Sequence, residues 1–364
     1  MIDLVVDARC LGHPGLGRHV RQVLRPEAHP GLRTAVIVPP GTPAASLPDP
    51  QLEIVEARSP IYAAREQVEL PLLIRRLRPR LVHFPHFNAP LVVPAPFLVT
   101  IHDLAYFGPA APTGSRSPRR LAATLVYRSA ARRARAIVTV SETMKAEIVA
   151  RLAVDPARIT VIPNAVDPIF GPAAPGSIAE AAAPMILYVG SWQPRKNVPI
   201  LVAAFRALRA TRPLRLVLAG KTTPAEREAV AAACHLDHPD IVQAGDLPDP
   251  DLAALYRAAT VFVFPSDYEG FGIPVAEAMA SGTPVVAGAC AAVVEVAAGA
   301  ARLVPLPLTP EALAAAIAAL LDDPELRRHL ADLGIGRARE FTIARTAESM
   351  RRAYDRAVTT AGSD

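Results

Sequence analysis

The sequence predicts an α/β protein of two domains, each built on a parallel sheet. Short apolar runs such as Val261–Phe264 have no polar alternation, which is typical of strands buried on both faces. Segments with helical character follow these runs, and the strand–helix alternation restarts at Met185–Val189. A chain of 364 residues is long for one hydrophobic core, so two domains are expected.

The composition is that of a folded protein with an uneven charge distribution. Hydrophobic residues make up 51% of the chain, and the formal net charge is +5. Residues 1–170 carry a net charge of +8, whereas residues 171–364 carry −3. A basic first half indicates an anionic partner or a membrane surface. Only three of the 39 basic residues are lysines, so Lys145, Lys196 and Lys221 stand out.

The cysteines and the N-terminus indicate the cellular location. Cys10, Cys234 and Cys290 are far apart and odd in number, which indicates neither a disulfide framework nor a metal site and fits a reducing cytosol. The first residues, MIDLVVDAR, lack the basic and apolar regions of a signal peptide. The longest uncharged stretches contain Pro or Gly and are too short to span a membrane. We therefore expect a cytoplasmic protein.

In the first half, apolar runs alternate with segments expected to be helical. Helices are expected to begin at Arg18, to span Glu66–Leu77, and to follow Ser141, whose side chain suits a helix cap. Residues 39–50 are rich in proline and are expected to form a loop. The expected strands are Ile2–Val6, Thr34–Val38, Leu81–Phe84, Phe97–Ile101, Ala136–Val140 and Ile159–Ile162.

A glycine-rich loop joins the first expected strand to the first helix. Its Gly15-x-Gly17 spacing departs from a dinucleotide fingerprint, because Val20 stands at the third glycine position. The strand Thr34–Val38 also ends without an acidic residue that could hold a ribose. A tight turn is the structural alternative. We favour a loop whose backbone, at Gly15 and Gly17, comes close to a ligand.

Two further features of the first half are candidates for binding. His102 and Asp103 follow the strand Phe97–Ile101, at the end of a strand where ligands of open α/β sheets bind. A histidine there could orient a sugar hydroxyl, and the alternative is a pair that only fixes the loop.

Residues 115–135 contain seven arginines and no acidic residue, interleaved with Leu121, Leu125, Val126 and Tyr127. This spacing predicts a basic amphipathic helix, which is either a solvated face or a docking surface for an anionic membrane or a lipid-diphosphate acceptor.

In the second half, a glycine and two cations follow the strand Met185–Val189. Gly190 lets the backbone approach a ligand, and Arg195 and Lys196 stand where the next helix begins. Arginine offers a fork to two phosphate oxygens and lysine a point charge, so this pattern suits a diphosphate. Taken alone, an Arg–Lys pair is more often a surface feature. Lys221 is a further candidate for lining a nucleotide cleft.

The stretch Val261–Val286 carries the strongest functional pattern. A loop containing Gly270 and Gly272 leads from a strand into a short helix, whose N–H groups and partial positive charge favour anions. Glu269 and Glu277 bracket this junction and offer acceptors for hydroxyl groups. A sugar diphosphate meets both demands. The alternative is that Glu277 only complements the helix dipole and that Glu269 is an exposed loop charge.

The remaining elements of the second half follow the same alternation. A helix is expected to begin at Val198, and the last strand is expected to begin at Val285. The other expected strands are Leu214–Ala219 and Ile241–Gly245, and the other expected helices are Glu226–Ala233, Leu252–Ala258, Val275–Ala280, Thr309–Leu321, Glu325–Glu340 and Ile343–Val358.

The string E-G-F-G-x-P-x-x-E-A-M-A-x-G-x-P-V-V, which begins at Glu269, resembles the signature of retaining glycosyltransferases of the GT-B fold. It is specific to family 4, the glycosyltransferase group 1 proteins. Their hallmark is a pair of glutamates separated by seven residues, and Glu269 and Glu277 have this spacing. The strings P-R-K-N, G-x-G-R and TIHDLAYF resemble other motifs of this family. Ser191 stands where many members have an arginine, which leaves Arg195 as the arginine of this loop.

This resemblance implies a GT-B fold, with two Rossmann-like, doubly wound parallel-sheet domains facing across a cleft. It implies an acceptor-binding domain at residues 1–170, a linker at 171–184 and a nucleotide-sugar-binding domain at 185–341. The helix within 342–364 would cross back to the N-terminal domain.

The resemblance also implies a role for each candidate residue. It implies that Glu277 holds the ribose of the donor and Glu269 its sugar, with His102 near the anomeric centre. The diphosphate would be held by Arg195, Lys196 and the amides around Phe271 and Gly272. Gly15 and Gly17 would lie close to the sugar. Gly190 and Lys221 would line the nucleotide cleft.

The implied reaction is retaining transfer of a hexose from a nucleotide diphosphate sugar to an acceptor hydroxyl, without a metal or other cofactor. Asp249-Pro-Asp251 is similar to the D-x-D that holds Mg²⁺ in the other main glycosyltransferase fold, but its place before the expected helix Leu252–Ala258 indicates capping. The strings HFPHFNAP and TIHDL resemble the mannosyltransferase-like branch that builds surface polysaccharides, which favours GDP-mannose.

The expected partners are the nucleotide-sugar donor, a sugar or lipid-linked acceptor, and an anionic membrane surface through residues 115–135 on the inner face of the membrane. No nucleic acid is expected. Two alternatives stay open: a nucleotide-sugar 2-epimerase of the same fold, and a non-catalytic subunit that binds sugar nucleotides.

Overall fold

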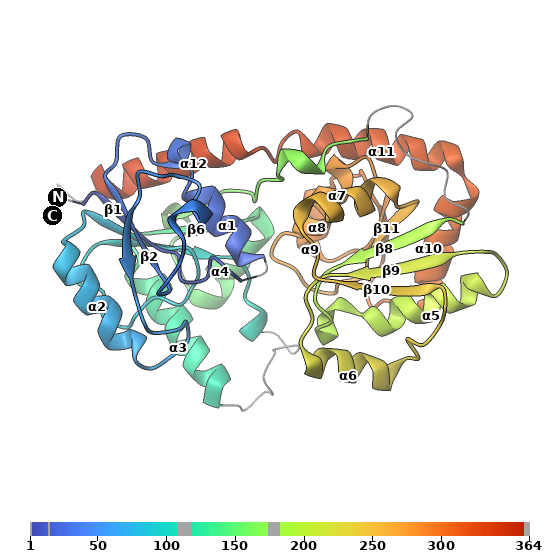
Figure 1. The fold of residues 1–364 in the computed structure, drawn as a ribbon, viewed down its shortest axis with the longest axis horizontal. Helices are drawn as coiled ribbons and strands as arrows, with labels where there is room; N and C mark the ends of the chain where they lie inside the picture. Colours follow the sequence, from blue (N-terminus) through green and yellow to red (C-terminus); the bar gives the residue numbers. More distant parts are fainter. Residues whose placement is uncertain (1, 14, 108–117, 174–182, 360–364) are drawn as a thin grey trace. The chain divides into compact units, whose positions relative to one another are not determined.

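The computed structural model describes residues 2–13, 15–107, 118–173 and 183–359. Contacts divide the chain into two compact units (Figure 1). Unit 1 comprises Met1–Ala165 and Ile343–Asp364, and unit 2 comprises Val166–Thr342. The chain therefore leaves unit 1, completes unit 2 and then returns to unit 1.

Unit 1 is built on a seven-stranded parallel sheet with the order β3-β2-β1-β4-β5-β6-β7. β1 lies between β2 and β4, and its Val5 lies opposite Ala35 of β2 and Val82 of β4. Helices cover the sheet, so its inner strands are buried and mostly apolar, with Asp7, His83 and Thr100 as buried polar residues. The strands are β1 (Leu4–Asp7), β2 (Thr34–Val38), β3 (Glu53–Glu56), β4 (Leu81–Phe84), β5 (Phe97–Ile101), β6 (Ala136–Thr139) and β7 (Ile159–Val161).

The last helix of the chain is part of the core of unit 1. Met350 and Tyr354 of α12 are fully buried against the sheet, and the Tyr354 hydroxyl lies 2.7 Å from Nδ1 of His83 on β4. The helices of this unit are α1 (Leu16–Val23), α2 (Glu66–Leu77), α3 (Pro118–Arg133), α4 (Glu142–Leu152) and α12 (Ile343–Thr359), with short 3₁₀ turns η1 (Pro26–Ala28), η2 (Ala44–Ser46), η3 (Ala105–Phe107) and η4 (Pro156–Arg158).

Unit 2 is built on a six-stranded parallel sheet with the order β10-β9-β8-β11-β12-β13. The order reverses between β8 and β11, which is where doubly wound sheets bind ligands beyond their carboxyl ends. The strands are β8 (Met185–Val189), β9 (Arg215–Ala219), β10 (Ile241–Gly245), β11 (Val261–Phe264), β12 (Val285–Gly288) and β13 (Arg302–Val304).

Figure 1 shows α5 and α8 on opposite faces of the unit 2 sheet. On one face, Phe205 of α5 and Ile317 of α10 pack with Tyr188 of β8 in a buried cluster. The helices of this unit are α5 (Val198–Arg209), α6 (Pro224–Ala233), α7 (Asp249–Ala258), α8 (Ile273–Ala280), α9 (Ala291–Ala297), α10 (Pro310–Asp322) and α11 (Pro324–Ala338), with 3₁₀ turns η5 (Pro168–Phe170) and η6 (Pro194–Lys196).

Several predicted elements are confirmed to the residue, and others begin earlier or later than predicted. The strand Thr34–Val38 and the helix Glu66–Leu77 have the predicted bounds, and Ser141 caps α4 by accepting a hydrogen bond from the amide of Met144 at 3.0 Å. The first strand runs from Leu4 to Asp7 rather than from Ile2, and α1 begins at Leu16 rather than at Arg18.

The interpretation of Asp249 and Asp251 as residues ahead of a helix is corrected by the structure. α7 begins at Asp249 itself, so both carboxylates lie in its first turn, where they complement the partial positive charge. β3, α9 and β13 are not predicted from the sequence. The charged ends of β3, Glu53 and Glu56, conceal its strand character.

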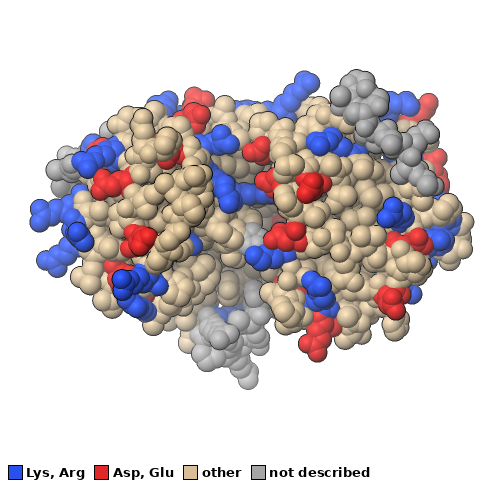
Figure 2. All heavy atoms as spheres, in the orientation of Figure 1, with Lys and Arg blue, Asp and Glu red and all other residues tan. Residues whose placement is uncertain are grey.

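Within the residues described, no helix is both long enough and apolar enough to cross a bilayer. Basic and acidic side chains are interspersed on the face shown in Figure 2.

Candidate functional site

At the carboxyl edge of the unit 2 sheet, two loops far apart in sequence are tied together. The loop after β8 ends at Asn197, whose left-handed backbone (φ 51°) is a conformation that asparagine tolerates. Its Nδ2 donates to the Pro265 carbonyl at 3.0 Å and to Asp267 Oδ1 at 2.6 Å, both in the loop after β11. The Asp267 amide also donates to the Arg195 carbonyl at 2.9 Å. The loops therefore hold one relative position.

These loops bring three of the predicted site residues together. Arg195 Nη1 donates to the Tyr268 carbonyl at 2.8 Å and lies 3.3 Å from Glu269 Oε1. Lys196 Nζ donates to the same carboxylate oxygen and lies 4.9 Å from the centre of the Phe264 ring. We call Arg195, Lys196 and Glu269 the Arg195 cluster.

The Arg195 cluster is largely withdrawn from solvent and carries a net positive charge. Its side chains are only 9–13% exposed. Burial raises the pKa of Glu269, but the charges of Lys196 and Arg195 outweigh that effect and hold the pKa below its ordinary value. With two cations and one ionised carboxylate, the cluster has a surplus charge of +1, which favours an anionic ligand.

Two glycines allow the ends of β8 and β9 to approach each other. A Cβ on Gly220, whose φ is 119°, would lie 2.6 Å from the Gly190 carbonyl oxygen. A Cβ on Gly190 would lie 2.9 Å from the Tyr188 hydroxyl, which donates to the Ser191 carbonyl. Burial raises the pKa of Tyr188, so its hydroxyl stays protonated. Lys221 is exposed beyond Gly220.

Phe271 and Gly272 immediately precede α8, and Gly272 is its N-cap. Gly272 adopts φ 99°, and a Cβ there would lie 3.3 Å from a methyl group of Val293. The Phe271 ring is buried and packs edge-on against Phe341 at 5.3 Å between centroids. The side chain therefore serves the core, and the predicted binding role falls to the backbone amides, which at a helix start have no partner within the helix.

Glu277 lies further along α8 and contacts a residue that the sequence analysis missed. Its side chain is almost fully buried, and its Oε2 accepts a hydrogen bond from the Tyr256 hydroxyl of α7 at 3.0 Å. No local sequence pattern marks this pairing, because 21 residues separate its partners.

In unit 1, His102 lies just past the carboxyl end of β5. Its Nε2 donates to the Pro85 carbonyl at 2.9 Å, so in the neutral ring Nδ1 is an acceptor. Burial lowers the pKa of His102, although Pro85 and Asp103 oppose that shift. The His19 ring lies edge-on to it at 4.5 Å, and burial also lowers the pKa of His19. The imidazole rings of His102 and His19 are therefore in contact here in their neutral form.

The two predicted glycines of unit 1 differ in what the backbone requires. Gly15 caps α1 with φ 76°, and a Cβ at this position would meet only open space. At Gly17 a Cβ would lie 2.2 Å from the Leu11 carbonyl oxygen, so only glycine fits. Gly17 is in close contact with the protein's own backbone at Leu11, so Gly15 is the one of the two that is accessible to a ligand.

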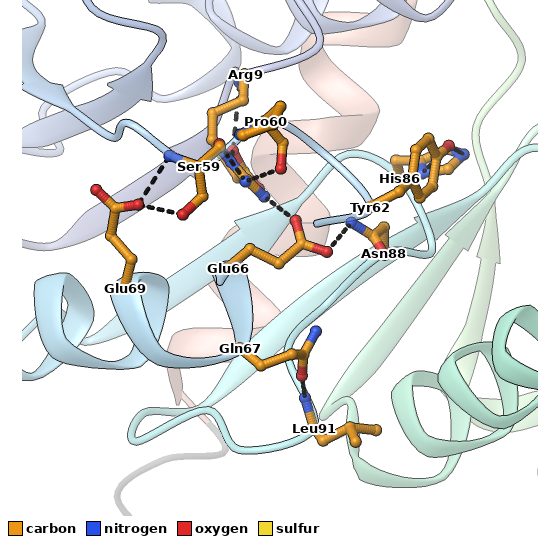
Figure 3. Close-up of polar contacts among 11 residues, drawn as sticks. Arg9, Ser59, Pro60, Tyr62, Glu66, Gln67, Glu69, His86, Asn88 and Leu91 are labelled. Atoms are coloured by element: carbon orange, nitrogen blue, oxygen red, sulfur yellow. Dashed lines mark hydrogen bonds and ion pairs between the residues drawn. The ribbon is translucent and has the colours of Figure 1, made fainter. Parts of the chain in front are cut away.

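Sequence analysis also missed a buried charge network beyond β1, drawn in Figure 3. Arg9 donates to Asp7 Oδ2 at 2.8 Å and to Glu66 Oε2 at 3.0 Å, and Asn88 donates to Glu66 Oε1 at 2.9 Å. Burial raises the pKa of Glu66, and Asn88 and Arg9 counteract this. We call Asp7, Arg9, Glu66 and Asn88 the Arg9 network. The position of Arg9, two residues after a strand end, was a usable signal.

Next to this network, Figure 3 shows Tyr62 beside His86. The Tyr62 side chain is 53% exposed, and its backbone has φ 66°, which is uncommon for an aromatic residue.

The basic segment 115–135 is described from Pro118, where α3 begins, and residues 108–117 lie outside the described part. Tyr127 is buried, but Leu121 and Leu125 are 65% and 57% exposed. Arg128 and Arg132 are exposed on the same face, at helical spacing from Leu125.

Two protein-family models match the chain. The model described as "Glycosyltransferase Family 4" matches residues 14–170, and "Glycosyl transferases group 1" matches residues 177–336. The D-inositol 3-phosphate glycosyltransferase of Actinosynnema mirum is 32% identical over 283 residues, which are 72% of this chain and 67% of that protein. The chain belongs to the group 1 glycosyltransferases of family 4. The motif that begins at Glu269 therefore identified the family correctly.

Two other relatives are matched over a smaller share of their own length. The D-inositol 3-phosphate glycosyltransferase of Kineococcus radiotolerans is 32% identical over 72% of this chain and 66% of its own length. The MMP alpha-(1->4)-mannosyltransferase of Mycolicibacterium hassiacum is 35% identical over 61% of this chain and 54% of its own length. The chain thus spans less than two thirds of the length of both.

Solved structures establish the fold of the glycosyltransferase. The sucrose-phosphate synthase of Thermosynechococcus elongatus has a TM-score of 0.81 at 23% identity, covering 99% of this chain and all of that chain. HepE of Anabaena, solved with UDP-glucose, has a TM-score of 0.76 at 17% identity with the same coverage. The expectation of a GT-B fold is confirmed.

Proposed function

We propose that the protein transfers a hexose, with retention of anomeric configuration, from a nucleotide diphosphate sugar to an acceptor hydroxyl. The Arg195 cluster is the observation that supports this most. A diphosphate needs cations that are held in place, and Arg195 and Lys196 are held by Glu269, Tyr268 and the loop contacts of Asn197.

In this proposal the cations bind the diphosphate and the carboxylates bind hydroxyl groups. Arg195 offers a planar fork and Lys196 a point charge to the phosphate oxygens, helped by the amides of Phe271 and Gly272. As the bond to the sugar breaks, negative charge grows on the leaving diphosphate, and the fixed cations stabilise it. Glu269 then accepts hydrogen bonds from the sugar, and Glu277 accepts them from the ribose.

His102 would orient the sugar near its anomeric carbon. Its neutral ring presents Nδ1 as an acceptor for a sugar hydroxyl. The anomeric carbon becomes oxocarbenium-like as the bond to the phosphate oxygen breaks and the acceptor oxygen bonds on the same face. The departing phosphate oxygen takes the proton of the acceptor hydroxyl. No metal enters this scheme, because Arg195 and Lys196 supply the positive charge.

The donor and acceptor are proposed from the relatives and from the sequence. Relatives include the O-antigen chain mannosyltransferase B of Escherichia coli, 36% identical over 43% of this chain, which supports mannose as the sugar. GDP as its carrier is proposed from the strings HFPHFNAP and TIHDL alone. The HepE complex with UDP-glucose supports a nucleotide-sugar donor in general. We place a sugar or lipid-linked acceptor at unit 1, and a role in surface polysaccharide or glycolipid synthesis follows.

We also propose that α3 docks on the anionic inner face of the membrane. Two exposed leucines on the same helix face as two exposed arginines combine apolar insertion with attraction to acidic lipids.

The function is tested by offering GDP-mannose, UDP-glucose and other nucleotide sugars to the purified protein and measuring binding by thermal shift and turnover by nucleoside diphosphate release. We expect one donor to stabilise the protein and to be consumed only with an acceptor. Conversion of the donor to an isomer without an acceptor would identify an epimerase. Stabilisation without turnover across an acceptor panel would identify a binding subunit.

Lys196→Ala is expected to weaken donor binding about 10- to 100-fold, the worth of a hydrogen bond to a charged group. Lys145→Ala, on α4 of unit 1, is the matched control and should leave binding unchanged. Equal affinities of the two variants would place the donor elsewhere.

A further inference from the structure

The contact between Tyr256 and Glu277 joins two buried polar groups on neighbouring helices of unit 2. The hydroxyl of Tyr256 and Oε2 of Glu277 are 3.0 Å apart, and the residues are 0% and 2% exposed. A buried tyrosine hydroxyl normally requires a partner, but an acidic side chain is a costly partner in a core, since its polar atoms must all be hydrogen-bonded. A contact that serves only packing would cost less with a neutral partner.

Three contacts fix the position of the Tyr256 hydroxyl. Its ring lies edge-on to Phe170 at 5.8 Å and to Phe262 at 5.4 Å between centroids. Its carbonyl accepts a hydrogen bond from Thr283 Oγ1 at 2.6 Å, just beyond the end of α8. α7 is therefore attached to α8 at Glu277 and to the turn after α8 at Thr283, so the phenol has one place relative to the helix that carries the carboxylate.

A fixed donor determines how a carboxylate is turned. The glutamate side chain has three rotatable bonds, and its last torsion is broad when nothing holds it. The phenol O–H holds Oε2 and thereby sets the plane of the carboxylate. A ribose presents two neighbouring hydroxyl groups, and a carboxylate accepts from both only when its plane is turned correctly.

We propose that Tyr256 is a positioning residue that orients Glu277 toward the two ribose hydroxyls of the donor and makes the site selective for ribonucleotides. This inference rests on the proposed function, because it requires the nucleotide to bind beside α8. Tyr256 does not touch the ligand in this scheme and acts through Glu277.

The test is a comparison of nucleotides with and without ribose hydroxyls. Calorimetry measures the affinities of the full-length protein for UDP and GDP and for their 2′,3′-dideoxy analogues. For the base that binds, we expect the wild type to prefer the ribonucleotide about 10- to 100-fold. In Tyr256→Phe we expect a preference of about 3-fold or less, with the affinity for the dideoxy analogue unchanged.

Tyr354→Phe is the matched control. Tyr354 is also fully buried and also has a hydroxyl within hydrogen-bond distance of a buried side chain, but it lies in unit 1. It should keep the wild-type preference even if it lowers stability. A wild-type preference retained in Tyr256→Phe overturns the inference and leaves the proposed function standing. No binding of either nucleotide or of any donor by the wild type overturns the proposed function itself.

The Tyr256→Phe variant could fail to fold because Glu277 loses the hydrogen bond from the phenol. In that case the comparison moves to Glu277→Gln. That variant removes the charge and keeps an acceptor for Tyr256, so part of the ribose preference should remain. Adding Tyr256→Phe to Glu277→Gln should abolish the remainder. The same preference in the single and double variants would show that Tyr256 does not act through residue 277.

Discussion

At the carboxyl edge of the unit 2 sheet the Arg195 cluster carries a net charge of +1, whereas beyond β1 of unit 1 the Arg9 network carries −1. Both are buried, and the formal charges of their own side chains sum to opposite signs. The difference teaches which ligand each edge suits. The proposed function assigns the diphosphate to unit 2 and the acceptor to the edge of unit 1, which combines acidic groups, neutral imidazoles and the exposed Tyr62.

The largest expected effect comes from removing the one cation of the Arg9 network. Arg9→Met leaves the buried carboxylates of Asp7 and Glu66 together without their counter-charge, and should lower the free energy of unfolding by about 3–5 kcal/mol. Urea denaturation measures this. Arg33→Met breaks an exposed ion pair with Glu53 and should cost less than about 1 kcal/mol. Similar losses would show that the network is not a buried charge assembly.

Acidification should lower the stability of unit 1 more than that of unit 2. Burial lowers the pKa of His83 to about 3, while an unfolded histidine titrates near 6.5. Between these values the unfolded chain binds more protons, so unit 1 loses stability as the pH falls, by about 2 kcal/mol at pH 5 for this one residue. In unit 2 the pKa of Glu269 is lowered, so its contribution is still present at pH 5 and is lost only below its unfolded value near 4.5.

Hydrogen exchange of the intact chain at pH 7 and pH 5, corrected for intrinsic rates, measures this difference by segment. Protection of β4 and β5 should fall more than that of β8 and β11. Equal losses of protection in both sheets would contradict the expected difference between unit 1, with its neutral histidines, and unit 2, with its ion-paired Glu269.

The smallest expected effect concerns α3. The wild type should bind vesicles of phosphatidylcholine with phosphatidylserine, and salt should weaken that binding. Arg128→Gln and Arg132→Gln should each weaken it by about 1 kcal/mol. Arg75→Gln and Arg76→Gln, on the exposed end of α2, are the matched controls. Binding that is absent at low salt, or that falls equally in both pairs, would remove the membrane from the proposal.

The sequence was informative where a functional residue lies in a local pattern at a strand end. Lys196 and Glu269 are 73 residues apart, yet each follows a buried strand, and parallel strands gather such loops at one edge. The α/β class and the family followed from the same patterns. Boundaries were less accurate where a glycine or a charged residue sits at the end of an element, as at Gly15 and Asp249.

The remaining residues depend on packing that no local pattern records. Tyr256 looks like an ordinary core aromatic in α7 until its hydroxyl is placed against Glu277. Glu66 is 57 residues from Arg9, and its helix gives no sign that this acidic residue faces inward. His102 was singled out because ligands of open α/β sheets bind beyond strand ends. The same rule would have singled out Arg9, because it also follows a strand end.

The return of α12 to unit 1 has a consequence for how the chain is made. The ribosome releases unit 2 as one uninterrupted segment, but the buried Met350 and Tyr354 emerge only with the final helix. Unit 1 begins first and can close its core only last, so the usual order of domain completion during synthesis is inverted. Until translation reaches that helix, the nascent first sheet exposes the apolar face that Met350 and Tyr354 later cover.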